Sequence, residues 1–221
     1  MAGASVRRTD GIAYGPDRLL DLYEPDQSRG SVAILLWHGS GADERDVLGP
    51  LAHQIAAAGV PTIVPDWNDD DGGRGKHHLS ASLAFTNDLA ERSGIARIVL
   101  AGWSLGASAG LDVVLLSSIL GGWRPDGFIG VSGAFEGSPY SDRRSFDITA
   151  GPSVPVLLIH GSSDEVVPVA RSRLTFDRLV GAGWDVSLRE VHADHAGAIG
   201  AIYDPVRSAG IDRSPDPGRR W

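Results

Sequence analysis

Short apolar runs that alternate with helix-like segments constrain the fold of this chain more than any other feature. Residues 32–37, "VAILLW", are continuously apolar, and similar runs follow in "ARIVLAG" (96–102), "DGFIGVSG" (126–133) and "VPVLLIHG" (154–161). A strand is apolar on both sides when helices cover both faces of its sheet. We therefore predict an α/β fold with a doubly wound, mostly parallel sheet that contains these four strands.

Further strands and helices complete the alternation. We expect the first strand at "RLLDLYEP" (18–25), and two more at residues 60–67 and 184–191. Apolar residues that recur at helical spacing predict the intervening helices. The predicted helices cover residues 43–58, 79–91, 105–120, 169–183 and, as a short last helix, 193–204.

The length and composition of the chain fit one domain. A chain of 221 residues with 42% hydrophobic content can bury a sizeable core, so we predict a single domain over residues 1–221. The segment 204–221 is polar and rich in proline and glycine. That composition predicts a flexible C-terminal tail.

Charge and cysteine content argue against several classes of function. The net charge is -8 and lysine and arginine are not clustered, which argues against a nucleic-acid partner. Without cysteine there is no disulfide, thiolate metal site or cysteine nucleophile. No stretch reaches the roughly 18 apolar residues of a membrane span, and the N-terminus lacks an apolar signal-peptide core. We expect a cytoplasmic protein that binds no membrane.

The strand "ARIVLAG" runs directly into "GWSLG", in which Gly102 and Gly106 flank Ser104. A sharp strand-to-helix turn at the carboxyl end of a parallel strand would expose the Ser104 hydroxyl, and the two glycines would avoid backbone collisions. We predict that Ser104 is a nucleophile. The free N–H of Leu105, at the start of the next helix, would stabilise a negative substrate oxygen. A helix-capping serine between packing glycines is the alternative.

A serine nucleophile needs a base, and a neutral histidine is the usual one. Two of the seven histidines, His192 and His195, follow the last predicted strand. His195 lies in "ADHAG", where small neighbours would let its imidazole reach a site, so we predict that His195 is the base. We expect His192 to end the strand or support the loop. The other five occupy earlier turns and helices: His38, His53, His77, His78 and His160.

A carboxylate must hold the base in one tautomer. Asp164 follows the strand at 154–161 by a short turn, which places it at the same edge of the sheet as Ser104. We predict that Asp164 is this residue. Asp142 and Asp147, after the preceding strand, are alternatives, and we expect Glu165 to point away.

The chain order Ser104, Asp164, His195 is that of the α/β-hydrolase triad. Together with "HGSG", "GWSLG", "HGSSDEVVP" and "DHAG", it makes the sequence similar to the α/β-hydrolase superfamily from about Arg18 to Ile202. "DLYEP" and "DHAG" most resemble its serine-esterase and dienelactone-hydrolase-like branches. The resemblance implies the fold of that superfamily and hydrolysis by an activated serine.

The resemblance also implies a second oxyanion donor. In the superfamily, the loop that follows "HGS" donates the second N–H, which here falls on Ser40 or on Gly41. This chain departs from the HGGG pattern of many lipases and esterases, which weakens a formamidase-like assignment.

Motifs for metal and cofactor binding are weak. "DWNDDDGG" precedes His77 and His78, but its carboxylates do not fall at calcium-loop offsets. Adjacent histidines on a helix would project about 100° apart. Nucleotide-phosphate motifs do not occur either. We predict neither a metal nor a cofactor.

The connection between the strands at 126–133 and 154–161 leaves little room for a lid domain. We therefore expect an open site, with Trp67 and residues 135–140 as candidates for its lining. The predicted function is hydrolysis of small or medium carboxylic esters through an acyl-enzyme. Amide, thioester or enol-lactone hydrolysis on the same residues, or a non-catalytic ligand-binding role, are the alternatives.

Overall fold

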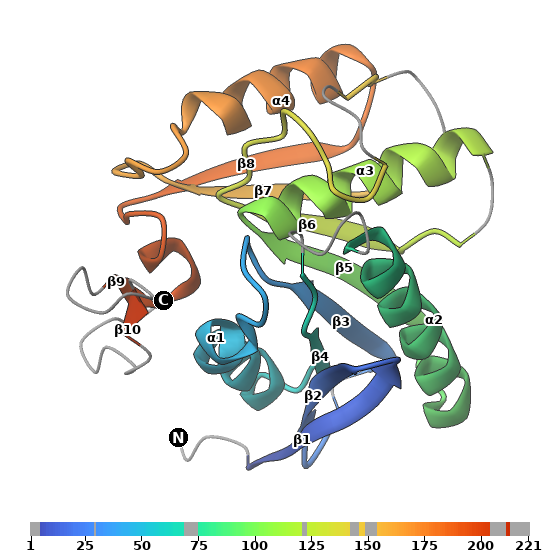
Figure 1. The fold of residues 1–221 in the computed structure, drawn as a ribbon. Helices are drawn as coiled ribbons and strands as arrows, with labels where there is room; N and C mark the ends of the chain where they lie inside the picture. The colour runs from blue at the N-terminus through green and yellow to red at the C-terminus, as the bar shows by residue number, and fades with distance from the viewer. Residues whose placement is uncertain are drawn as a thin grey trace.

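The computed structural model of the chain describes residues 5–28, 30–68, 75–120, 123–141, 146–148, 154–203 and 211–212. One large sheet is built from strands β1 (Val6–Gly15), β2 (Arg18–Pro25), β3 (Val32–Trp37), β4 (Thr62–Pro65), β5 (Arg97–Trp103), β6 (Gly127–Val131), β7 (Val156–Gly161) and β8 (Val186–Val191). Their order across the sheet is β1-β2-β4-β3-β5-β6-β7-β8 (Figure 1).

Most of the sheet is parallel. The pairs from β4 through β3, β5, β6 and β7 to β8 are all parallel, whereas β1 pairs with β2 and β2 with β4 in antiparallel fashion. The predicted doubly wound, mostly parallel sheet is therefore confirmed. Because parallel strands share a direction, the residues that follow β3, β5, β6 and β7 come out at one edge of the sheet.

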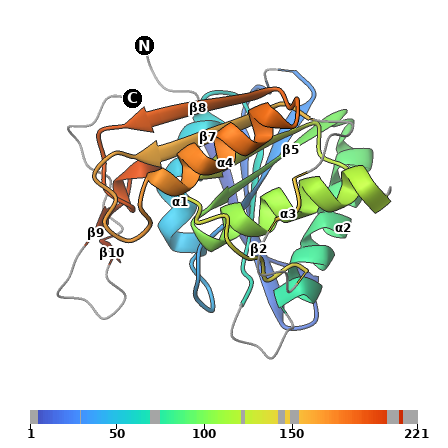
Figure 2. The ribbon, with the colours of Figure 1, turned by 90° about the horizontal axis from the view of Figure 1, so that it is seen from above.

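Helices cover both faces of this sheet. They are α1 (Arg45–Ala57), α2 (Gly75–Ser93), α3 (Leu105–Leu120), α4 (Ala170–Gly181) and the short 3-10 helix η1 (Gly197–Ile199). Seen from above, α3 and α4 lie on one side of the strands and α1 lies on the other (Figure 2).

The apolar core follows the alternation of side chains along the strands. In β3, Leu35 and Trp37 belong to a cluster with residues of α2, α3 and α4, and Leu36 belongs to a second cluster with residues of α1 and η1. Successive side chains of a strand point to opposite faces. The continuous apolar run of β3 is therefore explained by burial on both faces.

The first strand differs from the prediction. The first predicted strand, residues 18–25, is strand β2 of the structure. Strand β1 precedes β2 in the chain and pairs with it at the edge of the sheet. Residues 7–11 of β1 are exposed. A strand that buries so few side chains has no apolar run or clean alternation for sequence reasoning to detect.

The chain after β8 also differs from the prediction. A helix was expected over residues 193–204, but only η1 forms, and it ends at Gly200, which adopts a positive φ of 76°. Residues 202–203 form strand β9 (Ile202–Tyr203), which pairs with β10 (Ile211–Asp212) in a separate two-stranded sheet. The rest of the predicted tail, 204–210 and 213–221, lies outside the described residues.

Helix α2 begins at Gly75 and ends at Ser93, so it contains the predicted helix 79–91 and extends it at both ends. Within the described ranges, no helix combines the length and the apolar character needed to cross a bilayer.

Candidate active site

Ser104 lies in the sharp turn between β5 and α3. Its φ is +55°, in the left-handed region that a serine rarely adopts. The turn is fixed on the side of β6, because the Ser104 N–H donates to the carbonyl of Val131 over 2.9 Å. Strain of this kind persists only where the surroundings enforce it, and it presents a side chain at a strand end.

The two glycines of "GWSLG" are required by contact. A Cβ at Gly102 would overlap the backbone carbonyl of Gly106, and a Cβ at Gly106 would overlap the carbonyl of His38. Neither collision involves a flexible side chain that could move away. The turn can therefore form only with glycine at both positions, because any side chain there would collide with the backbone, as the sequence predicts.

The first amides of α3 face the Ser104 turn. The Ser104 carbonyl accepts hydrogen bonds from Ala107 and Ser108, over 3.1 and 3.3 Å. Over the described part of the chain, the N–H groups of Leu105 and Gly106 have no hydrogen-bond partner. Unpaired N–H groups at a helix N-terminus attract negative charge.

The loop after β3 packs against the same turn. A Cβ at Gly39 would lie 3.2 Å from the Ser104 Cβ and 3.2 Å from the ring of Trp103. Ser40 follows, and it is exposed. The structure therefore brings the "HGSG" loop beside Ser104, although the contact with the serine is made by Gly39.

Asp164 and His195 are in direct contact. The Nδ1 atom of His195 is 2.7 Å from Oδ2 of Asp164. The other carboxylate oxygen, Oδ1, accepts the amides of Val166 and Val167 over 2.9 and 2.8 Å. The Asp164 side chain is fully buried and that of His195 is 12% exposed. A buried carboxylate with these partners can hold an imidazole in one tautomer.

Trp103 connects the His195 loop to the serine turn. Its indole Nε1–H donates to the carbonyl of His195 over 3.1 Å, and the two rings are 5.0 Å apart. Because Trp103 immediately precedes Ser104, this contact sets His195 beside the Ser104 turn. Within the described residues, the Ser104 hydroxyl makes no hydrogen bond to His195. Such bonds are often long before substrate binds.

The loops that carry Asp164 and His195 are hydrogen-bonded to each other through their backbones. The Ser163 N–H donates to the carbonyl of Ala193 over 3.0 Å, and Ser162 N–H donates to Val191 over 2.8 Å. The loop after β7 and the loop after β8 therefore form one unit. Asp164 and His195 keep their relative positions because their immediate neighbours are hydrogen-bonded.

The alternative residues lie differently. His192 is exposed and lines a cavity of about 930 Å³ on the α1 side of the sheet. Asp147 and Glu165 are exposed, and Asp142 lies outside the described residues. Among the described residues, the His195 ring is hydrogen-bonded to Asp164 and to none of these alternative side chains.

Sequence reasoning missed a third member of this cluster, His160. Its Nε2 atom is 3.3 Å from Oδ2 of Asp164, and its side chain is fully buried. The available signal was the repeated pair His-Gly after an apolar strand, at residues 38–39 and again at 160–161. The sequence predicts only that both histidines lie in His-Gly turns at strand ends.

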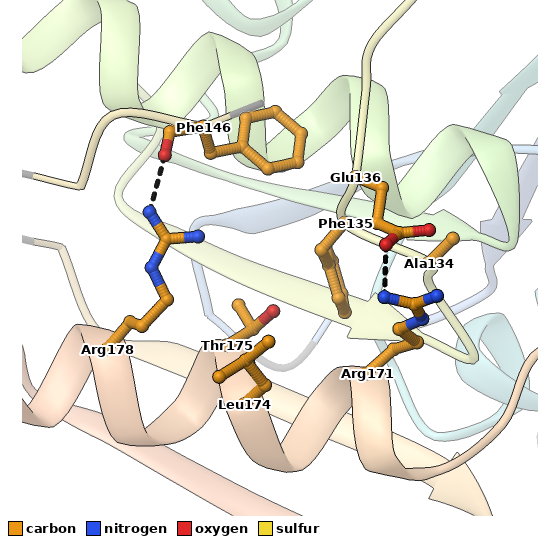
Figure 3. Close-up of a pocket in the computed structure, with 8 residues that line it drawn as sticks. All are labelled: Ala134, Phe135, Glu136, Phe146, Arg171, Leu174, Thr175 and Arg178. Atoms are coloured by element: carbon orange, nitrogen blue, oxygen red, sulfur yellow. Dashed lines mark hydrogen bonds and ion pairs between the residues drawn. The ribbon is translucent and has the colours of Figure 1, made fainter. Parts of the chain in front are cut away.

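A pocket of about 190 Å³ lies between the segment after β6 and α4 (Figure 3). Arg171 forms an ion pair with Glu136 at one end of it, and Arg178 donates to the carbonyl of Phe146 over 2.6 Å at the other. Phe135, which the sequence predicts as a lining residue of the substrate site, lines this pocket. Neither this pocket nor the 930 Å³ cavity is lined by Ser104, Asp164 or His195.

Trp67 has a structural role instead of lining a pocket. It is fully buried, stacks on His38 with 5.4 Å between ring centroids, and donates its backbone N–H to His38 Nε2. The two histidines considered as metal ligands differ in burial, because His77 is exposed whereas His78 is buried. Across the described ranges, no three His, Asp or Glu side chains are grouped so that they could hold a metal ion.

Comparisons with known proteins agree with this architecture. The model of the phospholipase/carboxylesterase family matches residues 82–198, which is more than half of the chain. No curated protein matches the chain by sequence.

Solved esterases share the fold. An inhibited form of esterase B from Lactobacillus rhamnosis superposes with a TM-score of 0.73 at 17% identity, covering 86% of this chain and 79% of that one. A truncated carbohydrate esterase from gut microbiota gives 0.69 at 17% identity, with 89% and 91% covered. A bacterial heroin esterase gives 0.66 at 19% identity, with 90% and 78% covered. The fold is that of the α/β-hydrolases, as the sequence motifs predicted.

Proposed function

This chain belongs to the phospholipase/carboxylesterase family of α/β-hydrolases, and from that premise we propose that it is a serine hydrolase that cleaves carboxylic esters through an acyl-enzyme. The observation that carries the proposal is the 2.7 Å contact between His195 Nδ1 and the buried Asp164 carboxylate. This pair lies beside the strained turn of Ser104, joined to it by Trp103. The predicted nucleophile, base and acid therefore share one edge of the sheet.

The contact with Asp164 assigns the protons of the His195 ring. A carboxylate only accepts, so Nδ1 carries the proton that is shared with Oδ2, and Nε2 is left as the basic nitrogen. Nε2 removes the proton of the Ser104 hydroxyl as the oxygen attacks the ester carbonyl. Asp164 then stabilises the imidazolium that forms.

The tetrahedral oxyanion needs N–H donors. We assign the first to Leu105, whose amide is without a partner in the described part of the chain. We assign the second to Ser40, next to the Gly39 that packs on Ser104. Donors fixed in advance at the place where charge develops supply a large part of the catalysis in such sites.

The reaction then runs in two halves. Collapse of the first tetrahedral intermediate breaks the bond to the leaving alcohol, and His195 Nε2–H protonates that alcohol. Water next attacks the acyl-Ser104 ester, giving its proton to Nε2. The second intermediate collapses to release a carboxylic acid, and Ser104 regains its proton. No metal or cofactor takes part in these steps.

The proposed substrates are small or medium esters. Segment 132–155 connects β6 to β7, and its described residues, 132–141, 146–148 and 154–155, contain neither a helix nor a strand. A lid domain is usually what buries a long acyl chain, so these residues support an open site. Trp67 is occupied with His38 and adds nothing to an acyl pocket.

Labelling with a fluorophosphonate tests the proposal, because only an activated serine reacts quickly with it. We expect rapid labelling of the wild type and none of Ser104→Ala, together with a loss of turnover on the order of a million-fold. Ser108→Ala, one helical turn away, is the matched control and should still be labelled. Equal labelling of wild type and Ser104→Ala would overturn the assignment of the nucleophile.

Matched ester, thioester and anilide substrates with the same acyl group test the bond class. We expect the highest initial rate on the ester and a fall in rate as the acyl chain becomes long. An anilide rate at or above the ester rate would identify an amidase instead.

A further inference from the structure

We propose that His160, a histidine outside the predicted triad, is a positioning residue that fixes the Asp164 carboxylate toward His195. The inference rests on the proposed function for its catalytic consequence, but the contacts that carry it do not depend on the reaction. They are the 3.3 Å separation of His160 Nε2 from Asp164 Oδ2, and two hydrogen bonds of the same ring, to Ser172 and Val167.

The partners of His160 determine its protonation pattern. Nε2 is 2.8 Å from the carbonyl of Val167, and a carbonyl only accepts, so Nε2 carries a proton. Nδ1 is 2.7 Å from the hydroxyl of Ser172, which can donate to it. The neutral Nε2–H tautomer therefore satisfies every polar atom of a fully buried ring.

The same nitrogen lies beside Asp164. Nε2 donates to the Val167 carbonyl over 2.8 Å, and Asp164 Oδ2 lies 3.3 Å from Nε2 without accepting a hydrogen bond from it. Oδ2 is also the oxygen that contacts His195, at 2.7 Å. The His160 ring therefore packs against the oxygen that contacts the base, and it is hydrogen-bonded to the loop that carries that oxygen.

Val167 makes this arrangement stiff. Its carbonyl accepts from His160, and its N–H donates to Asp164 Oδ1 over 2.8 Å. The loop that carries Asp164 is therefore folded around the His160 ring, and both backbone groups of Val167 are hydrogen-bonded. Ser172, in the first turn of α4, is buried and hydrogen-bonded to His160 Nδ1, so the ring is also attached to this helix.

The charged groups around His160 favour this geometry. Asp164 faces it from the acid loop, and Glu190 lies opposite it in the register of β8. Glu190 is paired with Arg173 of α4 over 2.6 Å. Asp164 has no arginine or lysine partner among the described residues, so two backbone amides and the His195 Nδ1–H replace water around its charge, and His160 holds one of those amides, that of Val167, in place.

Removing the His160 N–H should make the Asp164 carboxylate more mobile without removing any group that contacts the substrate. His160→Leu deletes the donor, and His160→Gln keeps an N–H group at a similar distance from the backbone. We expect His160→Leu to lower kcat by about 10- to 100-fold, with little change in KM, since releasing the Val167 carbonyl lets the loop that carries Asp164 shift, and a misplacement of about 1 Å in a catalytic group costs rate on that scale. His160→Gln should recover most of the lost kcat.

A matched control separates catalysis from stability. Leu158 is fully buried on β7, two residues before His160 and on the same face. Leu158→Ala should lower the melting temperature at least as much as His160→Leu, yet leave kcat within about threefold of wild type because it removes no contact to Asp164.

A spectroscopic measurement decides the outcome without turnover. Proton NMR should detect the deshielded Nδ1–H of His195 in the wild type, in His160→Gln and in Leu158→Ala, and should show it shifted upfield or lost to exchange in His160→Leu. If the wild type hydrolyses no ester, the function fails while this signal still tests the positioning role. Retention of the signal in His160→Leu, or an equal loss of kcat in Leu158→Ala, would overturn the inference.

Discussion

The dipeptide His-Gly follows strand β3 directly and ends strand β7, and the two turns use it for different purposes. His38 and His160 are each fully buried, and each bonds to the backbone of a neighbouring loop. Gly39 contacts the Ser104 turn, whereas a Cβ at Gly161 would overlap the carbonyl of Ala193 in the loop that carries His195. The first turn therefore borders the proposed nucleophile and the second borders the proposed base.

The two imidazoles have opposite tautomers. His38 Nδ1 donates to the Gly39 carbonyl over 2.8 Å, and its Nε2 accepts the Trp67 N–H over 3.1 Å. His160 donates from Nε2 instead, and its Nδ1 faces a Ser172 hydroxyl that can reverse its role. The first turn is held by two hydrogen bonds of the His38 ring to backbone groups, and the second lies beside the Asp164 carboxylate.

The largest expected effect lies in the second turn. Asp164→Asn should keep the fold but lower kcat by up to about ten-thousand-fold, because an amide can favour the wrong tautomer of His195. Steady-state kinetics with circular dichroism as a check of folding would measure this. If Asp147→Asn were crippling and Asp164→Asn harmless, the acid would have to be reassigned.

Replacing the glycine of each turn by alanine tests whether the two turns differ in how closely they are packed. Gly161→Ala should cost about a hundred-fold in kcat, since its Cβ would push the Ala193 carbonyl and displace the His195 loop. Gly39→Ala should cost less, because its Cβ meets Ser104 and Trp103 at 3.2 Å, where a shift of a few tenths of an ångström suffices. Equal effects on kcat would show that the turns are not distinguished in this way.

Trp67→Phe tests whether the first turn is mainly structural. The change keeps an aromatic ring against His38 and removes the Nε1–H that donates to the His38 carbonyl over 3.3 Å. We expect a loss of about 1–2 kcal/mol in the free energy of unfolding. Urea denaturation would measure it, and kcat should change by less than about tenfold. A collapse of kcat at unchanged stability would contradict a supporting role.

The smallest expected effect concerns Asp66, which precedes Trp67. Burial, with a contribution from the charge of Asp43, raises the pKa of the Asp66 carboxyl despite Arg18 nearby. A raised folded-state pKa means that ionisation opposes folding as the pH rises through that pKa, and the penalty vanishes below the unfolded value of about 3.9. Asp66→Asn should therefore melt higher than wild type near pH 7, and the difference should shrink toward pH 4. A constant difference across that range would contradict this explanation.

The sequence predicts the buried parts of this molecule better than the exposed ones. Burial on both faces produces the apolar runs of β3, β5, β6 and β7, and these were all placed correctly. The Ser104 turn was recognisable because its steric requirement leaves two glycines at fixed spacing. Strand β1 has no such signature, since its pairing depends on backbone groups and most of its side chains face solvent.

The site was harder to anticipate where a role depends on distance across the fold. The choice of His195 over His192 rested on small neighbours, and the structure adds the contact with Asp164. The link from His160 to Asp164 spans four residues in sequence, but it arises only because the loop folds back over the ring at Val167. A lone histidine at a strand end gives no local sign of such a loop.

The two outer strands, β1 and β8, are exposed, and this affects how readily the molecule can aggregate through its sheet edges. An open sheet edge offers unpaired N–H and C=O groups on which another chain could add a strand. At one edge, β1 carries the exposed Arg7 and Arg8, and at the other, β8 carries the exposed Arg189 and Glu190. A second molecule that extended the sheet at either edge would have to bring strand backbone against these solvated charges. The same charged residues that hide β1 from sequence analysis thus protect the sheet from edge-to-edge aggregation.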